Sequence, residues 1–484
     1  MVCAEDLLRR AAGDACTQRC IASNGECLDS ENQRVEPENR KKSFLRWPTE
    51  VLGPAPGLKE LNVACWGWFA AVLVIQFCFP LLLRIKAGAG WIHIFPSDFV
   101  YFYGIGRIAN GYSLARLYDY SLQLKTFNEI FPFHLHQGGY GPSPYPPFVA
   151  LFFSLFARFS VVPAFFLWAG VSLALYLAGI AAAIHGVFPG ERLKVSLIFA
   201  SALAFCPFLQ DTLSNGQIST LAVFGAGLAV MQERKSRPFA SGLVLSMLAY
   251  KPTLLLLLIP MLLLTRRFRT LGGFVAGSSL LALAATAFGG LQIWASYARF
   301  LGVFSQFVGF KGQSTYDLSM YVDIKSFMQA VSGGWSRTEL VFFMALAIAM
   351  AAWLAVLFWN SAKGGRAAQS MAWATALTWT LLLNVYVPVY DSALLAIAAV
   401  LTLGALRELE WKMAMGWMSF LAVFTGVVSW ELETIAQSKG VQFLPILLAV
   451  FGLGELYILR EAIRRGLPRA ATEPATGKGG STVR

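Results

Sequence analysis

A carboxylate stands at the start of a short aromatic segment, residues 96–103 (PSDFVYFY), which follows the first long apolar run, residues 62–83. Ser97 or Asp98 can cap a helix that begins here, and Asn110-Gly111 can end it. A positioned carboxylate can also accept the proton of an attacking hydroxyl, which contributes about 10²–10⁴-fold to a rate. Helix capping and general-base catalysis are therefore both open interpretations of Asp98, and they can coexist.

A lysine and a proline, Lys251-Pro252, divide a long apolar stretch, residues 239–264, which has basic residues at both ends. Two short crossings with a turn at Lys251 keep both basic ends on one side of the membrane, as the distribution of positive charge favours. Each arm would be about 20 Å long, so the turn would stop inside the outer leaflet. A cation at that depth can bind the phosphate of a lipid-linked substrate, or it can extend to the headgroups.

Other polar and aromatic side chains are expected at the outer ends of the spans. Arg107, on the same predicted helix as Asp98, can pair with a substrate phosphate or with lipid headgroups. Tyrosine and amide side chains suit sugar binding, but they also suit an interfacial aromatic belt, a turn or a helix cap. The candidates for binding sugar or acceptor are Tyr101, Tyr103, Tyr145, Asn215, Gln217, Tyr390 and Asp391.

The metal-binding signals are weak. His134 and His136 alternate in the first long loop, and Glu129 would have to join them. We therefore expect no metal at the site and no cofactor. The sequence lacks an Asp-X-Asp motif and a Gly-rich phosphate loop, which argues against a nucleotide-sugar donor. A disulfide scaffold is not expected either, because none of the seven cysteines lies in the predicted outer loops.

The composition excludes a water-soluble domain. Of 484 residues, 56% are hydrophobic and 14% are charged, and the mean hydropathy is +0.57. The apolar runs match the ~20 residues that cross a bilayer as a helix. The formal charge of +12 comes from short Lys and Arg clusters between these runs, which favours a membrane protein over one that binds nucleic acid.

These runs predict an all-α polytopic membrane protein with about twelve transmembrane helices. Residues 1–61 form a polar tail, 62–460 the membrane domain and 461–484 a basic tail, with both termini in the cytoplasm. Two long outer loops, residues 84–146 and 289–337, are expected to carry interfacial helices, one of them at residues 119–131. Residues 147–157 are too short to cross and should only dip into the membrane.

Several short segments occur in an order that resembles glycosyltransferase family 87. They are SDFVYFY at 97–103, GR at 106–107, NG at 110–111, LYD at 117–119, YPPF at 145–148, NGQ at 215–217, ASGL at 240–243, YKPT at 250–253 and YVPVYD at 386–391. The resemblance implies a GT-C type fold and a polyprenyl-phosphate sugar as donor. The best-known members are mycobacterial mannosyltransferases that act on the outer face of the plasma membrane and build the cell envelope.

By this resemblance, Asp98 is the general base for an acceptor hydroxyl that displaces polyprenyl phosphate from a hexose, with mannose as the best-known case. Direct displacement inverts the anomeric centre, so a β-linked donor gives an α-linkage. Lys251 and Arg107 are the candidates for binding the donor phosphate. The expected partners are the lipid-linked sugar, a glycolipid or another acceptor, and membrane lipids. The alternative is a polytopic transporter or a glycolipid flippase.

Overall fold

The computed structural model describes residues 57–78, 82, 97–131, 143–188, 192–307, 317–334, 336–385 and 387–466. The chain divides into two units, Met1–Pro54 and Ala55–Arg484, and all the described residues belong to the second. Within the described ranges the chain is helical and contains no strand, only an isolated bridge between Tyr321 and Pro388. The predicted all-α class is confirmed, whereas the cysteine-bearing tail lies outside the described residues.

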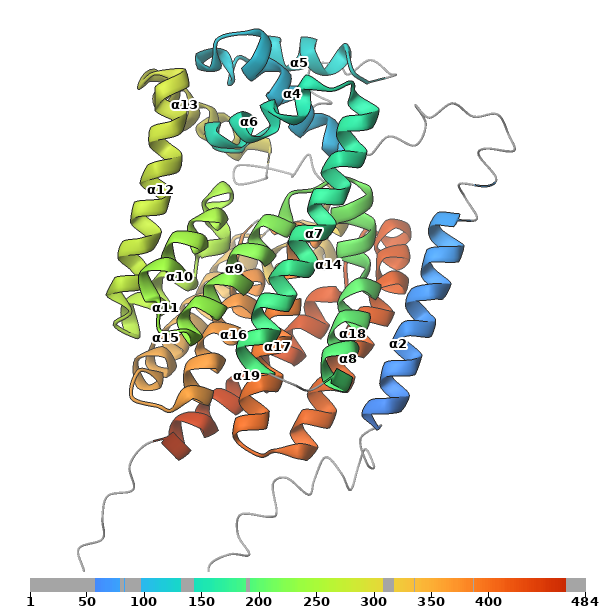
Figure 1. The fold of residues 1–484 in the computed structure, drawn as a ribbon, viewed down its shortest axis with the longest axis vertical. Coiled ribbons are helices and arrows are strands. Elements are labelled where there is room, and N and C mark those ends of the chain that lie inside the picture. Colours follow the sequence, from blue (N-terminus) through green and yellow to red (C-terminus); the bar gives the residue numbers. More distant parts are fainter. Residues whose placement is uncertain are drawn as a thin grey trace, which may run out of the picture. The chain divides into compact units, whose positions relative to one another are not determined.

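The helices follow one another in the order shown in Figure 1. They are α2 (Leu58–Val72), α4 (Ser97–Gly111), α5 (Tyr120–Asn128), α6 (Pro147–Ser154), α7 (Val161–Val187), α8 (Arg192–Ala204), α9 (Ser219–Arg234), α10 (Pro238–Leu245), α11 (Leu258–Leu264), α12 (Phe268–Gly289), α13 (Gln292–Phe307), α14 (Ile324–Ser332), α15 (Arg337–Ser361), α16 (Arg366–Leu382), α17 (Leu395–Glu408), α18 (Lys412–Lys439) and α19 (Leu444–Gly466). Short 3₁₀ or π segments join some of them, including η6 (Pro207–Ser214), η7 (Ser246–Tyr250), η8 (Pro252–Leu255) and η10 (Val389–Leu394).

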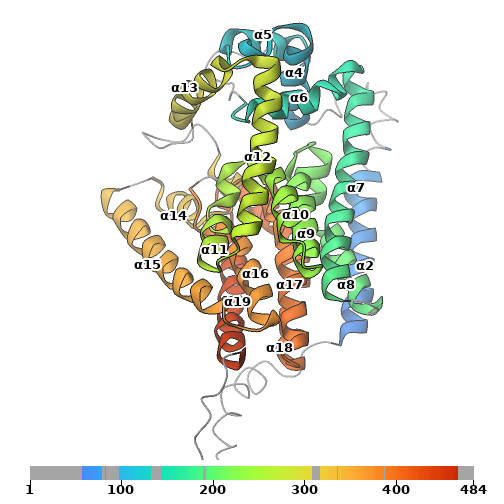
Figure 2. The ribbon, with the colours of Figure 1, turned by 60° about the vertical axis from the view of Figure 1, so that its left-hand side comes forward.

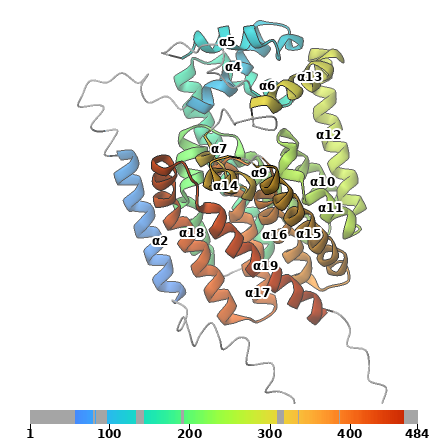
Figure 3. The same ribbon diagram turned by 180° about the vertical axis from the view of Figure 1, so that it is seen from behind.

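Two ends of this helical unit differ in character. At one end, which we call the α4 end, helices α4, α5 and α6 pack together and α13 lies beside them (Figures 1 and 2). At the other, which we call the arginine end, lie the turns at residues 235–237, 265–267 and 362–365. Helix α12 runs from the arginine end to the α4 end, and α2 packs against α8 and α18 (Figure 3).

Local signals account for the short helices at the α4 end. Helix α4 stops at Gly111, as the Asn110-Gly111 pair predicts. Helix α5 starts where the Asp119 carboxylate accepts hydrogen bonds from the backbone N–H groups of Ser121 and Leu122. The predicted helix in this segment is therefore confirmed, and residues 147–158 form α6 and a 3₁₀ turn rather than a crossing.

Five described helices are long and apolar enough to cross a membrane: α7, α12, α15, α18 and the η10–α17 segment. A sixth span results if α8 and η6, which meet at a bend of 58°, count as one. The total of about twelve and the interfacial position of the loop helices remain predictions.

The Lys251-Pro252 hairpin is present in the fold. Two short apolar helical segments, Pro238–Tyr250 and Pro252–Leu264, meet at Lys251. Beyond their far ends, the Arg267 guanidinium pairs with the Glu233 carboxylate. This ion pair brings the two basic turns together, so the segment enters and leaves at the arginine end.

Close helix packing depends on small residues. A Cβ at Gly227 of α9 would lie 2.0 Å from the carbonyl oxygen of Gly179 in α7. Without side chains at this crossing the two backbones can approach closely, as is common between membrane helices. This contact fixes α9, whose first residues lead into the candidate site.

Candidate active site

Asp98 lies in the first turn of α4, where its side chain is half-buried. Its Oδ2 atom accepts a hydrogen bond from Nε2 of Gln217, at 2.9 Å. The backbone N–H of Phe99 donates to the carbonyl oxygen of Asn215, also at 2.9 Å. The Asn215-Gly216-Gln217 turn, which follows the π-helix η6, therefore holds both the start of α4 and the carboxylate of Asp98.

Gly216 is required at the centre of this turn. Its φ of +75° lies in the left-handed region, and a Cβ there would come within 2.6 Å of the Phe99 Cβ. Its carbonyl oxygen accepts a hydrogen bond from Nε1 of Trp168, at 2.9 Å. The interpretation of Asn-Gly as a turn is therefore confirmed, and the turn also places Gln217 against Asp98.

The environment of Asp98 suits a proton acceptor. Burial raises the pKa of its carboxyl group above the ordinary aspartate value, and the hydrogen bond from Gln217 lowers it part of the way back. A higher pKa makes a carboxylate a stronger base. Perturbed acids of this kind are concentrated at functional sites.

Lys251 and Asp391 form a buried ion pair. Asp391 is fully buried, and its second carboxylate oxygen accepts a hydrogen bond from the Ser219 hydroxyl, at 2.8 Å. The Lys251 Nζ atom lies 5.0 Å from the ring centre of Tyr390. Because only 8% of Lys251 is exposed, the hypothesis that it extends to the headgroups is wrong. Capping by Asp391 is wrong as well, because α17 begins after Leu394.

Tyr145 links the two polar groups. Its ring centre lies 5.0 Å from that of Phe102 in α4 and 6.3 Å from that of Tyr250, the residue before Lys251. Gln217, which binds Asp98, and Ser219, which binds Asp391, are two residues apart in the chain. The structure therefore brings together Asp98, Tyr145, Asn215, Gln217, Lys251, Tyr390 and Asp391 in one region, with Ser219 and Tyr250 added.

Tyr101 lies one turn after Asp98, and its ring packs edge-on against Phe127 and Phe131. Burial and the nearby Asp98 carboxylate raise the pKa of Tyr101 to about 12. The phenol therefore keeps its proton at neutral pH and can donate a hydrogen bond near Asp98.

Tyr103 and Arg107 lie apart from this group. The Tyr103 hydroxyl donates to the carbonyl oxygen of Phe159, at 2.8 Å, which gives it a structural role. Arg107 is exposed and lies 3.6 Å from the Glu129 carboxylate. It follows Asp98 by about 14 Å along the helix axis, so the fold does not bring it to Asp98.

Asp211 was missed by the sequence analysis. It lies on η6, is buried, and its Oδ2 atom has no hydrogen-bond partner within the described part of the chain. It also interacts electrostatically with Asp98. Its place between an apolar run and the Asn215-Gly216 turn is the one sequence signal that could have identified it.

The metal-ligand candidates of the first long loop and the described residues have to be considered separately. His134 and His136 lie outside the described residues. Across the described ranges, no group of three or more His, Cys, Asp or Glu side chains could hold a metal ion. The described cysteines, Cys65, Cys78 and Cys206, are free thiols.

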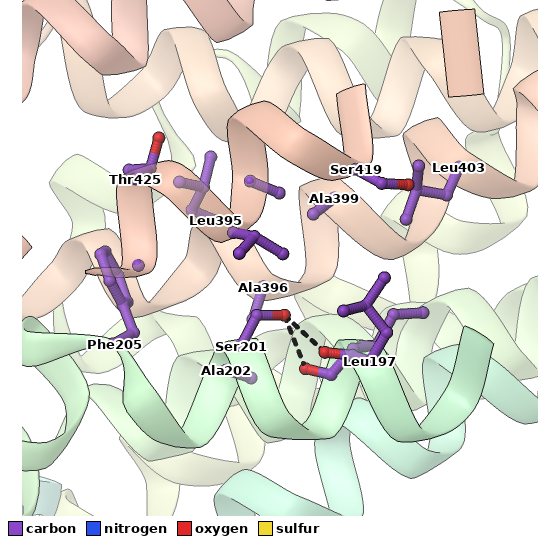
Figure 4. Close-up of a pocket in the computed structure, with 14 residues that line it drawn as sticks. Leu197, Ser201, Ala202, Phe205, Leu395, Ala396, Ala399, Leu403, Ser419 and Thr425 are labelled. Atoms are coloured by element: carbon purple, nitrogen blue, oxygen red, sulfur yellow. Dashed lines mark hydrogen bonds between the residues drawn. The ribbon is translucent and has the colours of Figure 1, made fainter. Parts of the chain in front are cut away.

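An apolar crevice of about 50 Å³ lies between α8 and the α17–α18 pair (Figure 4). Alanines and leucines dominate its lining, and it contains no ionisable side chain. Ser201 also lines the crevice, and its hydroxyl donates to the carbonyl oxygens of Leu197 and Ile198. Phe205 marks the end of the crevice nearest η6, the segment that carries Asp211.

Several apolar helices long enough to span a bilayer, together with a cluster of polar side chains at the α4 end, define an integral membrane protein. The model of glycosyltransferase family 87 matches residues 144–388, half of the chain, so this protein belongs to that family and is a membrane glycosyltransferase. The match includes Gln217 and Lys251, whereas Asp98 and Asp391 lie outside it. Family membership decides for an enzyme over a transporter. No curated protein and no solved structure matches the chain.

Proposed function

We propose that this enzyme transfers a hexose, with mannose as the first sugar to test, from a polyprenyl-phosphate donor to an acceptor hydroxyl with inversion. The observation that carries the proposal is the Asp98 carboxylate, which Gln217 orients in a half-buried position where its pKa is raised. A general base needs this combination of access, orientation and basicity.

In the proposed step, Asp98 accepts the proton of the acceptor hydroxyl while that oxygen forms a bond to the anomeric carbon. The bond from this carbon to the phosphate oxygen breaks, and polyprenyl phosphate leaves with the electron pair. Phosphate needs no protonation to leave, so one carboxylate suffices, unlike the two that glycoside hydrolysis uses. Attack opposite the leaving group converts a β-linked donor into an α-linked product.

Lys251 is the cation that we assign to the donor phosphate. An ammonium group has three N–H donors, and Asp391 fixes its position. The apolar crevice beside α8 is a candidate path for part of the polyprenyl chain, because its lining is mostly apolar and it ends near η6. Tyr101, Tyr145, Tyr390, Asn215 and Gln217 remain candidates for binding sugar or acceptor, and a glycolipid is the acceptor class that we favour.

The enzyme is proposed to act on the outer face of a bacterial plasma membrane, in cell-envelope synthesis. Basic residues gather in the turns at the arginine end, among them Arg234, Lys235, Arg237, Arg266 and Arg269. Positive loops favour the cytoplasmic side. The α4 end would then face outward, with both chain termini in the cytoplasm.

The test is a transfer assay with the purified chain, synthetic polyprenyl-phosphate mannose and a panel of lipid acceptors. We expect Asp98→Asn to reduce the rate by about 10²–10⁴-fold. Asp119→Asn is the matched control, because Asn caps a helix as well as Asp does and Asp119 lies outside the site. Equal rates for Asp98→Asn and the parent would remove the general-base role.

A further inference from the structure

A polar cavity opens at the arginine end, far along α9 and α16 from the candidate active site. Its volume is about 280 Å³, much more than the roughly 10–15 Å³ that one water molecule needs. We call it the arginine cavity, because Arg234, Arg267 and Arg366 line it together with Glu233, Ser370 and Trp373.

The first two turns of α16 supply one wall. Arg366, Gln369, Ser370 and Trp373 recur with the spacing that places residues on one face of a helix. The N-terminus of α16 therefore adds the partial positive charge of its free N–H groups to that of the arginines. Both contributions favour an anion.

Two of the arginines are held in place by carboxylates. The Arg267 guanidinium pairs with Glu233 and donates to Gln369 at 3.2 Å. Arg234 pairs with Glu408 at 3.0 Å and also donates to Ser370. Because a guanidinium has five N–H donors, each can keep these partners and still bind a ligand oxygen.

Two donors lack a partner. Arg366 is exposed and forms no ion pair with any residue that the structure describes. Trp373 is 97% buried, and its Nε1–H group has no acceptor within the same ranges. An unpaired buried N–H group is costly and needs an explanation. The Nε1 atom is not accessible from the cavity, so Arg366 is the donor that a bound oxyanion would meet directly.

Two cation–π contacts at this end are typical of helix ends that lie at a membrane surface. Arg266 lies 4.7 Å from the ring centre of Trp359, and Arg465 lies 4.5 Å from that of Trp411. Tryptophan and arginine together are typical of the depth of lipid headgroups. A basic cavity between helices at this depth suits a lipid phosphate.

We propose that the arginine cavity is a binding site for a phosphate group, which Arg234, Arg267 and Arg366 coordinate as donors. Guanidinium groups match phosphate oxygens in geometry and charge. The phosphate can come from an anionic phospholipid or from a soluble phosphate. The site is independent of Asp98 and of the transfer reaction.

The experiment measures binding to the purified full-length chain in two arms. One arm uses nanodiscs of phosphatidylcholine with or without phosphatidylglycerol, and native mass spectrometry reports the retained phospholipid. The other arm titrates inorganic phosphate into the protein in detergent. Binding of phosphatidylglycerol alone, of phosphate alone or of both identifies the source.

Arg366→Gln is the central variant, because its side chain is exposed and unpaired and its loss should not disturb the fold. We expect binding to weaken about tenfold or more, as for a lost hydrogen bond to a charged group. Lys363→Gln removes an equal charge from the same exposed turn outside the cavity and should bind like the parent. Absence of binding by the parent, or equal binding by all three chains, would overturn the proposal.

Discussion

The two ends of α9 lie next to groups of opposite charge: carboxylates at the α4 end and guanidinium groups at the arginine end. At the α4 end, its first residue Ser219 bonds to the buried Asp391, and a half-buried carboxylate, Asp98, stands nearby without a paired cation in the described ranges. At the arginine end, its last residue Arg234 lines a cavity rich in guanidinium groups. The difference suggests that one end accepts protons from a substrate, while the other binds an anion without chemistry.

The largest expected effect is the loss of stability when the buried ion pair at the α4 end is broken, compared with breaking a partly exposed pair at the arginine end. Lys251→Met leaves Asp391 charged and unpaired in a fully buried place, and removing one partner of such a pair typically costs about 3–5 kcal/mol. Glu408→Gln breaks the Arg234–Glu408 pair, whose side chains are 21% and 32% exposed, so we expect about 1 kcal/mol or less. Unfolding in a denaturant series compares the two.

The double variant Lys251→Met/Asp391→Leu serves as the control for this comparison. It removes both charges, so it should recover much of the stability lost in the single variant. Equal losses of unfolding free energy for Lys251→Met and Glu408→Gln would contradict the expected difference between a buried and a partly exposed ion pair.

An intermediate effect is expected at the turn that holds Asp98. Gly216→Ala and Gly440→Ala both place a side chain at positive φ, +75° and +71°, which costs about 1–2 kcal/mol. Only Gly216→Ala also forces a Cβ against Phe99, and such overpacking typically adds about 1–3 kcal/mol. Thermal unfolding and transfer rates check both, and a transfer rate lowered equally by the two substitutions would argue against the tight contact.

The smallest effect is expected for Arg107→Gln. Its pair with Glu129 is exposed and 3.6 Å long, and such pairs contribute about 1 kcal/mol or less. The variant should transfer sugar nearly as well as the parent does. A large rise in KM for the donor would instead restore Arg107 as a ligand of the donor phosphate.

Local signals in the sequence sufficed for several elements. The end of α4 at Gly111, the Asp119 cap of α5 and the hairpin at Lys251 follow from neighbouring residues and from the basic charges around the apolar runs. Capping of α4 by Ser97 or Asp98 is not observed, because both residues lie within the helix. The family resemblance also put Asp98, Gln217, Lys251 and Asp391 on one list. The contacts between these side chains could not be predicted from the sequence. Gln217 and Asp98 are 119 positions apart, and Lys251 and Asp391 are 140 positions apart.

Individual roles were harder to predict than membership in the site. Tyr103 shares the motif of Asp98, yet its hydroxyl is used by a distant carbonyl group, that of Phe159. Trp373 and Arg366 carry no motif at all. Only the folded structure, in which α16, the end of α9 and the α11–α12 turn surround one cavity, shows that they line it.

The pH dependence of kcat/KM for sugar transfer tests the role of Asp98 most directly. A general base works only when deprotonated, so the rate should fall as the pH drops through the pKa of Asp98 in the free enzyme. Because burial raises that pKa, the fall should come at a higher pH than for an ordinary aspartate, and Gln217→Ala should move it higher still by removing the hydrogen bond that favours the charged form. We expect the acid limb to vanish in Asp98→Asn. An identical acid limb in that variant and in the parent would contradict the account.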